Sequence, residues 1–112
     1  MNNKSYMWMA SQYLIQLGAT PNYSGFHYAA YGIVLAAENP SRLLAVTKEL
    51  YPEIGRHYHV SWCAAERSIR FLLSILWERD QKLFREISGC SAVKKPSAGE
   101  FIAVMAFRVR SV

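Results

Sequence analysis

The stretch from Trp62 to Arg79 carries the strongest structural signal in the sequence. Ser61 precedes it, and serine is a favoured residue at the N-cap of a helix because its hydroxyl oxygen accepts a hydrogen bond from a free backbone N–H. Apolar residues then recur with the three- and four-residue spacing of a helix face that packs on a core, namely Ala65, Ile69, Leu72, Leu73 and Leu76. The spacing predicts a long helix over residues 62–79 whose apolar side packs against the rest of the chain.

Start and stop signals divide the rest of the chain into further helices. Asn39-Pro40 and Asp80 are typical of helix starts, Gly18 and Gly89 are typical of helix ends, and Ser97 with Glu100 forms an S-x-x-E capping box. Pro52 disfavours a helical residue before it and predicts a boundary near Tyr51. These signals predict helices over residues 9–17, 24–38, 40–51, 53–58, 81–87 and 98–109, with a loop over residues 90–96. Residues 101–109 also allow a short strand.

Length and composition set the class of protein. The 112 residues are enough for one domain, and a hydrophobic fraction of 52% excludes a disordered chain. We therefore predict a single helical domain over residues 1–112. Its fold class is all-α, a compact bundle of about six helices of the winged-helix-like or response-regulator effector class. Trp8 and Trp77 are predicted to anchor its core.

Residues 52–79 have the pattern of a helix-turn-helix. A short helix (PEIGRHY) precedes a tight turn at His59-Val60, and the long helix that Ser61 caps follows. Ile54 and the small Gly55 would let the first helix pack closely on the second. In DNA-binding proteins of this type, the second helix places its N-terminal residues in the major groove. The same geometry also occurs in helical bundles that bind nothing.

The polar side of the long helix supplies the candidate base contacts, which are Trp62, Cys63, Glu66 and Arg67. An arginine can donate two hydrogen bonds to guanine O6 and N7, and a glutamate can accept one from cytosine N4. Arg70, one turn later, is a candidate phosphate contact together with Ser61. An E-R-x-x-R pattern is also common on solvated helix faces.

The charge is unevenly distributed along the chain. The sequence has a net charge of +5 and an isoelectric point near 9.4, which favours a polyanion as partner. Residues 53–78 hold three arginines and three glutamates, whereas residues 79–112 hold seven basic and three acidic residues. The seven basic residues are Arg79, Lys82, Arg85, Lys94, Lys95, Arg108 and Arg110. They predict phosphate contacts that position a separate base-reading helix, chiefly through Lys94 and Lys95.

Other kinds of site have little support. His57, His59 and Cys63 lack a fourth ligand and match no usual zinc spacing, so we predict no metal site and no cofactor. No acid or glycine-rich loop accompanies a Cys-His pair, so we predict no enzyme activity and no catalytic residue. The longest charge-free apolar run, residues 28–37, is too short to span a bilayer. We expect a cytoplasmic protein that binds no membrane.

Several pieces of the sequence together resemble one known family. They are Leu17-Gly18, TKELYPEIGRHY (47–58), ERSIR (66–70), WER (77–79) and KPSAGEFIA (95–103). In this order and spacing, the set resembles the C-terminal effector domain of the sporulation initiation response regulator of endospore-forming Firmicutes. The resemblance covers nearly the whole chain from about Leu14 onward.

The resemblance implies an all-helical domain that binds double-stranded DNA through a helix-turn-helix. Domains of this family bind a TGTCGAA-type box, sit in tandem as pairs on adjacent boxes, regulate transcription and can contact RNA polymerase. By position, Glu66 and Arg67 match the family's base-contacting pair, and Arg70 matches a basic residue one turn later. Lys95 matches the lysine before the last helix and is an implied phosphate contact.

The sequence departs from the family in two places. The family usually has a base-contacting arginine two residues before the glutamate, and Ala64 occupies that position here. The family's N-terminal receiver domain, whose phosphorylation controls DNA binding, is absent from this sequence, so we expect a chain that is not switched in this way and that is constitutively active, controlled by abundance, or a fragment of a longer protein. Two hypotheses follow. The first is a small sequence-specific DNA-binding transcription regulator. The second is an interaction module that pairs with a full-length relative or RNA polymerase and reads little DNA sequence.

Overall fold

The computed structural model describes residues 3–89, 91 and 93–111, and this part of the chain forms helices and no strand. The elements are α1 (Asn3–Leu17), α2 (Ser24–Glu38), the 3₁₀ helix η1 (Pro40–Leu44), the π-helical η2 (Val46–Leu50), α3 (Tyr51–Tyr58), α4 (Trp62–Arg79), α5 (Gln81–Ser88) and α6 (Ala98–Arg110). The predicted all-α bundle is therefore confirmed. No helix in the described ranges is both long and apolar enough to cross a membrane.

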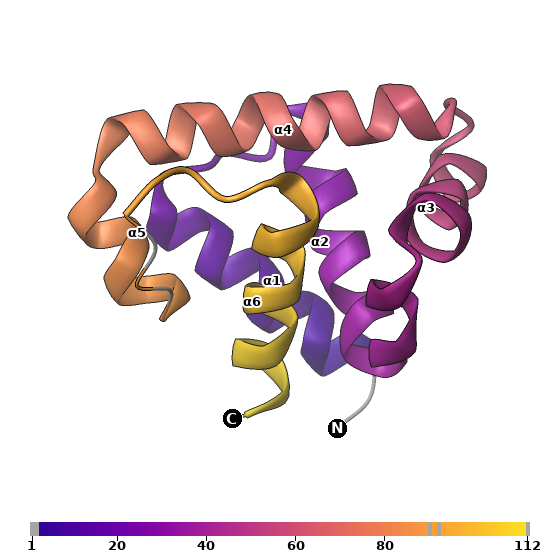
Figure 1. Cartoon of the computed structure of the whole chain (residues 1–112), viewed down its shortest axis with the longest axis horizontal. Helices are drawn as coiled ribbons and strands as arrows, with labels where there is room; N and C mark the ends of the chain where they lie inside the picture. Colours follow the sequence, from indigo (N-terminus) through magenta and orange to yellow (C-terminus); the bar gives the residue numbers. More distant parts are fainter. Residues whose placement is uncertain (1–2, 90, 92, 112) are drawn as a thin grey trace.

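Helix α2 is the centre of the bundle. It packs against α1, α4 and α6, and its buried residues lie on all sides of the helix. In Figure 1, α4 extends along one side of the molecule, with α3 beside its N-terminal end and α5 after its C-terminal end. The C-terminal end of α6 points away from α4. This arrangement leaves one long side of α4 uncovered by the other helices.

The helix ends predicted from capping residues are confirmed. The Ser61 hydroxyl oxygen accepts a hydrogen bond from the Ala64 N–H at 3.1 Å, and the Asp80 carboxylate accepts one from the Leu83 N–H at 3.0 Å. Ser97 and Glu100 form the full capping box, with reciprocal hydrogen bonds of 2.9 and 3.1 Å. Each cap satisfies a backbone donor that a helix start leaves without an intrahelical partner, and so fixes where α4, α5 and α6 begin.

The predicted helix over residues 40–51 is wrong. The backbone of Ala45, at φ −149° and ψ 64°, interrupts it and separates η1 from η2. The predicted boundary near Tyr51 is present, because the π-helical η2 ends at Leu50 and α3 begins at Tyr51, but the chain stays helical across it, since Tyr51 has helical angles. Leu50, Tyr51 and Ile54 are all buried. We infer that this burial outweighs the local preference against a helical residue before Pro52.

Three smaller expectations have mixed outcomes. Trp77 lies in the core as predicted, but Trp8 is 66% exposed on α1 and anchors nothing. Helix α1 begins at Asn3, six residues before the first predicted helical residue. Residues 101–109 are helical, so the alternative of a short strand is wrong. Cys90, in the predicted loop, lies outside the described residues.

The helix-turn-helix predicted within residues 52–79 is present as α3, a turn and α4. His59 has left-handed backbone angles (φ 60°, ψ 42°), which end α3 and reverse the chain. A Cβ atom on Gly55 would lie 2.5 Å from the carbonyl oxygen of Val60, so only glycine permits the turn to approach α3 this closely. Ile54 of α3 and Ala65 of α4 are fully buried.

Candidate nucleic-acid interface

The first three turns of α4 carry four exposed residues on its uncovered side, Cys63, Arg67, Arg70 and Phe71, and the exposed Glu78 lies on the same side two turns after Phe71. At 3.6 residues per turn they fall within an arc of about 100° around the helix. The buried residues of α4, which begin with Ala65 and Ile69, lie on the opposite side. We call these four residues the outward face. Their side chains are exposed, and Figure 1 shows one long side of α4 uncovered by the other helices.

Arg67 lies at the centre of the outward face. Its side chain is exposed, and within the described ranges its guanidinium has no ion-pair partner. An arginine in this state keeps all five N–H donors available for a ligand. Of the predicted base contacts, Arg67 therefore has the geometry that direct base recognition requires.

Glu66 and Arg70 form an ion pair along α4. The Arg70 Nε lies 3.2 Å from the Glu66 Oε2, with 25% of the Glu66 side chain and 58% of the Arg70 side chain exposed. The pair holds the Glu66 carboxylate at the edge of the outward face and lowers the repulsion between this carboxylate and a polyanion. Glu66 keeps acceptor capacity, because a carboxylate has two oxygens and about four lone-pair sites.

Trp62 lies about 140° around α4 from Arg67, outside the outward face. Its ring stacks nearly parallel on Tyr51, with 6.4 Å between ring centroids, and the side chain remains 40% exposed. Tyr51 is buried, and burial, with a smaller contribution from the Glu66 carboxylate, raises the pKa of Tyr51 to about 12. The phenol is therefore neutral at physiological pH, and its ring packs against the ring of Trp62.

Ser61 and Ala64 are adjacent in the first turn of α4. The Ser61 oxygen already accepts the capping hydrogen bond from the Ala64 N–H, which leaves its O–H hydrogen as a donor. Ala64 is half-buried, and its methyl group offers no hydrogen bond. The family that the sequence resembles has an arginine at this position. The start of α4 therefore holds fewer polar groups than the resemblance leads one to expect.

The segment before α6 brings two lysines close to α4. Lys95 donates a hydrogen bond from its ammonium nitrogen to the Ser74 hydroxyl oxygen at 2.8 Å, and Ser74 donates to the carbonyl oxygen of Arg70 at 3.1 Å. Lys94 is exposed next to it. The hydrogen bonds with Ser97, with a smaller contribution from Lys94, lower the pKa of Glu100. Two positive charges thus lie about two helical turns beyond Arg67 along α4.

Three of the seven basic residues in the C-terminal third stabilise the fold. Arg79 donates to the carbonyl oxygen of Gly18 at 3.2 Å, and Arg108 donates to that of Ile87 at 3.0 Å. The Arg85 guanidinium lies 5.2 Å from the centre of the Trp77 ring. These contacts tie α1, α4, α5 and α6 together. Of the other four, Lys95 contacts α4 through Ser74 and lies next to Lys94, so these two lysines add to the positive charge of Arg67 and Arg70 on α4.

Sequence reasoning missed Phe71, whose side chain is 61% exposed on the outward face. A signal for it was present. Phe71 lies four residues after Arg67 and outside the apolar stripe of α4, so helical spacing alone places it beside the arginine.

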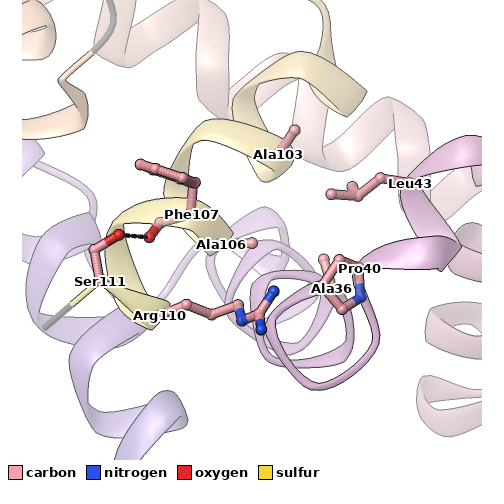
Figure 2. A pocket seen from close by; sticks show the side chains of 8 residues that line it. All are labelled: Ala36, Pro40, Leu43, Ala103, Ala106, Phe107, Arg110 and Ser111. Carbon is pink, nitrogen blue, oxygen red and sulfur yellow. Dashed lines mark hydrogen bonds between the residues drawn. The ribbon is translucent and has the colours of Figure 1, made fainter.

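A separate apolar groove lies between α2, η1 and α6 (Figure 2). Its volume is about 350 Å³, and it is lined by Ala36, Pro40, Leu43, Ala103, Ala106, Phe107, Arg110 and Ser111. Phe107 is 75% exposed beside it. The groove lies toward the end of α6 that points away from α4, so it is not continuous with the outward face. Its lining has one charged group, Arg110.

Comparison with known protein families finds a match over most of the chain. The model of the family described as "Sporulation initiation factor Spo0A C terminal" matches residues 10–109 of the chain. The matched segment contains the helix-turn-helix, the outward face of α4 and both lysines before α6.

Proposed function

This chain belongs to the Spo0A C-terminal domain family of DNA-binding effector domains, and on that basis we propose that it is a sequence-specific transcription regulator. In this proposal the outward face of α4 enters the major groove and reads a box of the TGTCGAA type. The observation that carries the proposal is the position of Arg67 on the uncovered side of the second helix of a helix-turn-helix, where it is exposed and has no ion-pair partner among the described residues. Major-groove recognition needs such a side chain.

The proposed base contacts have different roles. Arg67 donates two hydrogen bonds to a guanine, and Glu66, held by Arg70, accepts one from a cytosine. Cys63 lies one turn before Arg67 on the same face and makes a close contact with a neighbouring base. Trp62, supported by Tyr51, contacts the edge of the groove from beside the outward face.

The proposed phosphate contacts lie on both sides of Arg67. The Ser61 O–H donates to a phosphate at the start of α4, and Lys94 and Lys95 approach the backbone near Ser74. Arg70 contacts a phosphate with the guanidinium nitrogens that its ion pair with Glu66 leaves available. Such contacts fix the register of a protein on DNA and carry no sequence information themselves.

Selection from a random pool of DNA duplexes tests the proposal. We expect the purified protein to enrich one short box, and we expect tandem copies of it if two molecules bind side by side as in the resembling family. A pool that stays random after repeated rounds at moderate salt, with binding that depends only on salt concentration, would contradict sequence-specific recognition.

Restoring the family's arginine at position 64 should change the box in a defined way. The first turn of α4 bears a half-buried methyl group at this position, and an arginine there could donate to a guanine. We expect the pool that Ala64→Arg enriches to gain one guanine beside the wild-type box. Ala64→Gln, which is also long and polar but has no bidentate match to guanine, is the control. Identical boxes for Ala64→Arg and wild type would show that position 64 does not reach the bases.

Removing a phosphate contact should have a different effect. We expect Lys95→Ala to weaken binding to every duplex by the same factor and to reduce the slope of log affinity against log salt by about 1. Arg110→Ala, which removes one positive charge at the far end of α6, should leave the slope nearly unchanged. Fluorescence anisotropy titrations at several salt concentrations measure both slopes. A loss of preference between duplexes on Lys95→Ala would place this lysine among the base contacts instead.

A second candidate function is an interaction module that pairs with a full-length relative or with RNA polymerase. The apolar groove beside Phe107 favours this candidate, because exposed apolar surface of this kind is typical of protein contacts. Purified RNA polymerase and a purified full-length relative are the partners to test, with Phe107→Ala as the variant that should weaken binding. This candidate gains support if Phe107→Ala weakens such a complex and the pool selection enriches no box.

A further inference from the structure

Phe71 is the largest apolar side chain on the outward face. It is 61% exposed, and it neither belongs to the core nor packs against its edge. An exposed phenyl ring gains no burial energy in the free protein, and a single exposed apolar residue is by itself ordinary. What distinguishes Phe71 is its position among charged groups.

Cationic residues surround Phe71 along α4. Arg67 lies one turn before it, Arg70 precedes it directly, and Ser74, which holds the Lys95 ammonium at 2.8 Å, lies three residues after it. Residues three and four apart on a helix are neighbours in space. The arrangement places an apolar ring among groups that attract a polyanion, so the partner that covers the ring also carries negative charge.

DNA offers an apolar group in the major groove that matches such a ring. Thymine is the one base that carries a methyl group on its groove edge, and apolar side chains, including phenylalanine, contact it. Phe71 lies about 6 Å along the helix axis from Arg67, which is close to the spacing of two base pairs. A phenyl ring beside an arginine can therefore meet a thymine within two base pairs of the guanine that the arginine reads.

We propose that Phe71 is a specificity-determining residue that recognises the methyl group of a thymine next to the base that Arg67 contacts. This inference rests on the proposed function, because it assumes that the outward face of α4 lies in the major groove. It adds a base preference that neither hydrogen bonding nor the resemblance to the family supplies. The contact is apolar and depends on the methyl group alone.

Replacement of thymine by deoxyuridine tests the proposal, because it removes the methyl group and leaves base pairing intact. Each thymine of the box enriched from the pool is replaced in turn, and the affinities of wild type, Phe71→Ala, Phe71→Leu and Phe107→Ala are measured. Phe107→Ala is the matched control, since it removes another exposed phenyl ring, on α6. Thermal unfolding of each variant shows whether its fold is kept.

We expect wild type and Phe107→Ala to lose about fourfold in affinity at one thymine, the effect of burying one methyl group. Phe71→Ala should bind thymine and deoxyuridine duplexes equally, and Phe71→Leu should keep part of the preference. Equal binding of all deoxyuridine duplexes by wild type, or an unchanged methyl preference in Phe71→Ala, overturns the inference. Either result concerns Phe71 alone. If Arg67→Ala still reduces the preference for the box, the proposed function is kept, so a failure of the Phe71 inference can be distinguished from a failure of the proposed function.

Discussion

Arg67→Ala is expected to reduce strongly the preference of the protein for its box over unrelated duplexes. A bidentate arginine contact to guanine contributes roughly 1–3 kcal/mol of discrimination, or about 5- to 150-fold in affinity. The substitution should not affect folding, because the Arg67 side chain is exposed and has no ion-pair partner in the described ranges. Alanine is also a better helix former than arginine. The loss should therefore appear in DNA binding alone.

Competition titrations measure this effect. The labelled box is displaced by unlabelled box or by a shuffled duplex, and the ratio of the two affinities is compared between wild type, Arg67→Ala and Arg110→Ala. Arg110→Ala is the control for charge, because it also removes one arginine but from the groove at the far end of α6. We expect the ratio to fall by about 5- to 150-fold for Arg67→Ala and to keep its wild-type value for Arg110→Ala. A wild-type ratio in Arg67→Ala would remove this residue from the base contacts.

Gly25→Ala is expected to destabilise the domain by roughly 1–3 kcal/mol or more. A Cβ atom on Gly25 would lie 2.3 Å from the backbone carbonyl oxygen of Ser68, a distance that real Cβ contacts do not reach. Because that oxygen belongs to the backbone of α4, relief requires α2 and α4 to separate. The contact between these two helices supports the outward face, so its disruption would also weaken DNA binding.

Gly99→Ala is the matched control for this prediction. Gly25 and Gly99 are each the second residue of their helix, but a Cβ on Gly99 would meet its nearest atom, the Tyr51 hydroxyl oxygen, at an ordinary 3.7 Å. We expect Gly99→Ala to leave stability unchanged or to raise it by about 0.4–1 kcal/mol through a less flexible unfolded chain. Urea unfolding of both variants measures the difference. Equal stabilities would show that α2 and α4 are less closely packed than described.

Local chemistry predicted the helix ends correctly where a side chain caps the backbone. Ser61, Asp80 and Ser97 each make the expected hydrogen bond, so the starts of α4, α5 and α6 follow from the sequence. The interruption at Ala45 and the helical conformation of Tyr51 could not be predicted from the sequence in this way. There the backbone conformation is set by contacts with residues distant in the sequence, and Leu50 and Tyr51 are buried against the rest of the bundle. Periodicity within one segment carries no information on such contacts.

In the candidate site, too, some features follow from the local sequence and others depend on contacts between distant residues. The exposure of Arg67 and Phe71 follows from the spacing of the apolar stripe on α4. The contact between Lys95 and Ser74 joins residues 21 positions apart, and the stacking of Trp62 on Tyr51 joins the long helix to the residue before Pro52. Both depend on how the elements pack. The sequence therefore predicted Cys63, Arg67 and Arg70 on the outward face but missed Phe71, and the packing determined which neighbours support them.

Chemical-shift mapping of the isotope-labelled protein with its box duplex tests most directly whether the outward face of α4 binds DNA. We predict that the largest backbone amide shifts occur over residues 61–71 of the turn and α4 and over residues 93–97 before α6. Amides around Phe107 and along the groove should change little. Shifts concentrated on the groove, with the amides of Glu66 and Arg67 unchanged, would contradict the account.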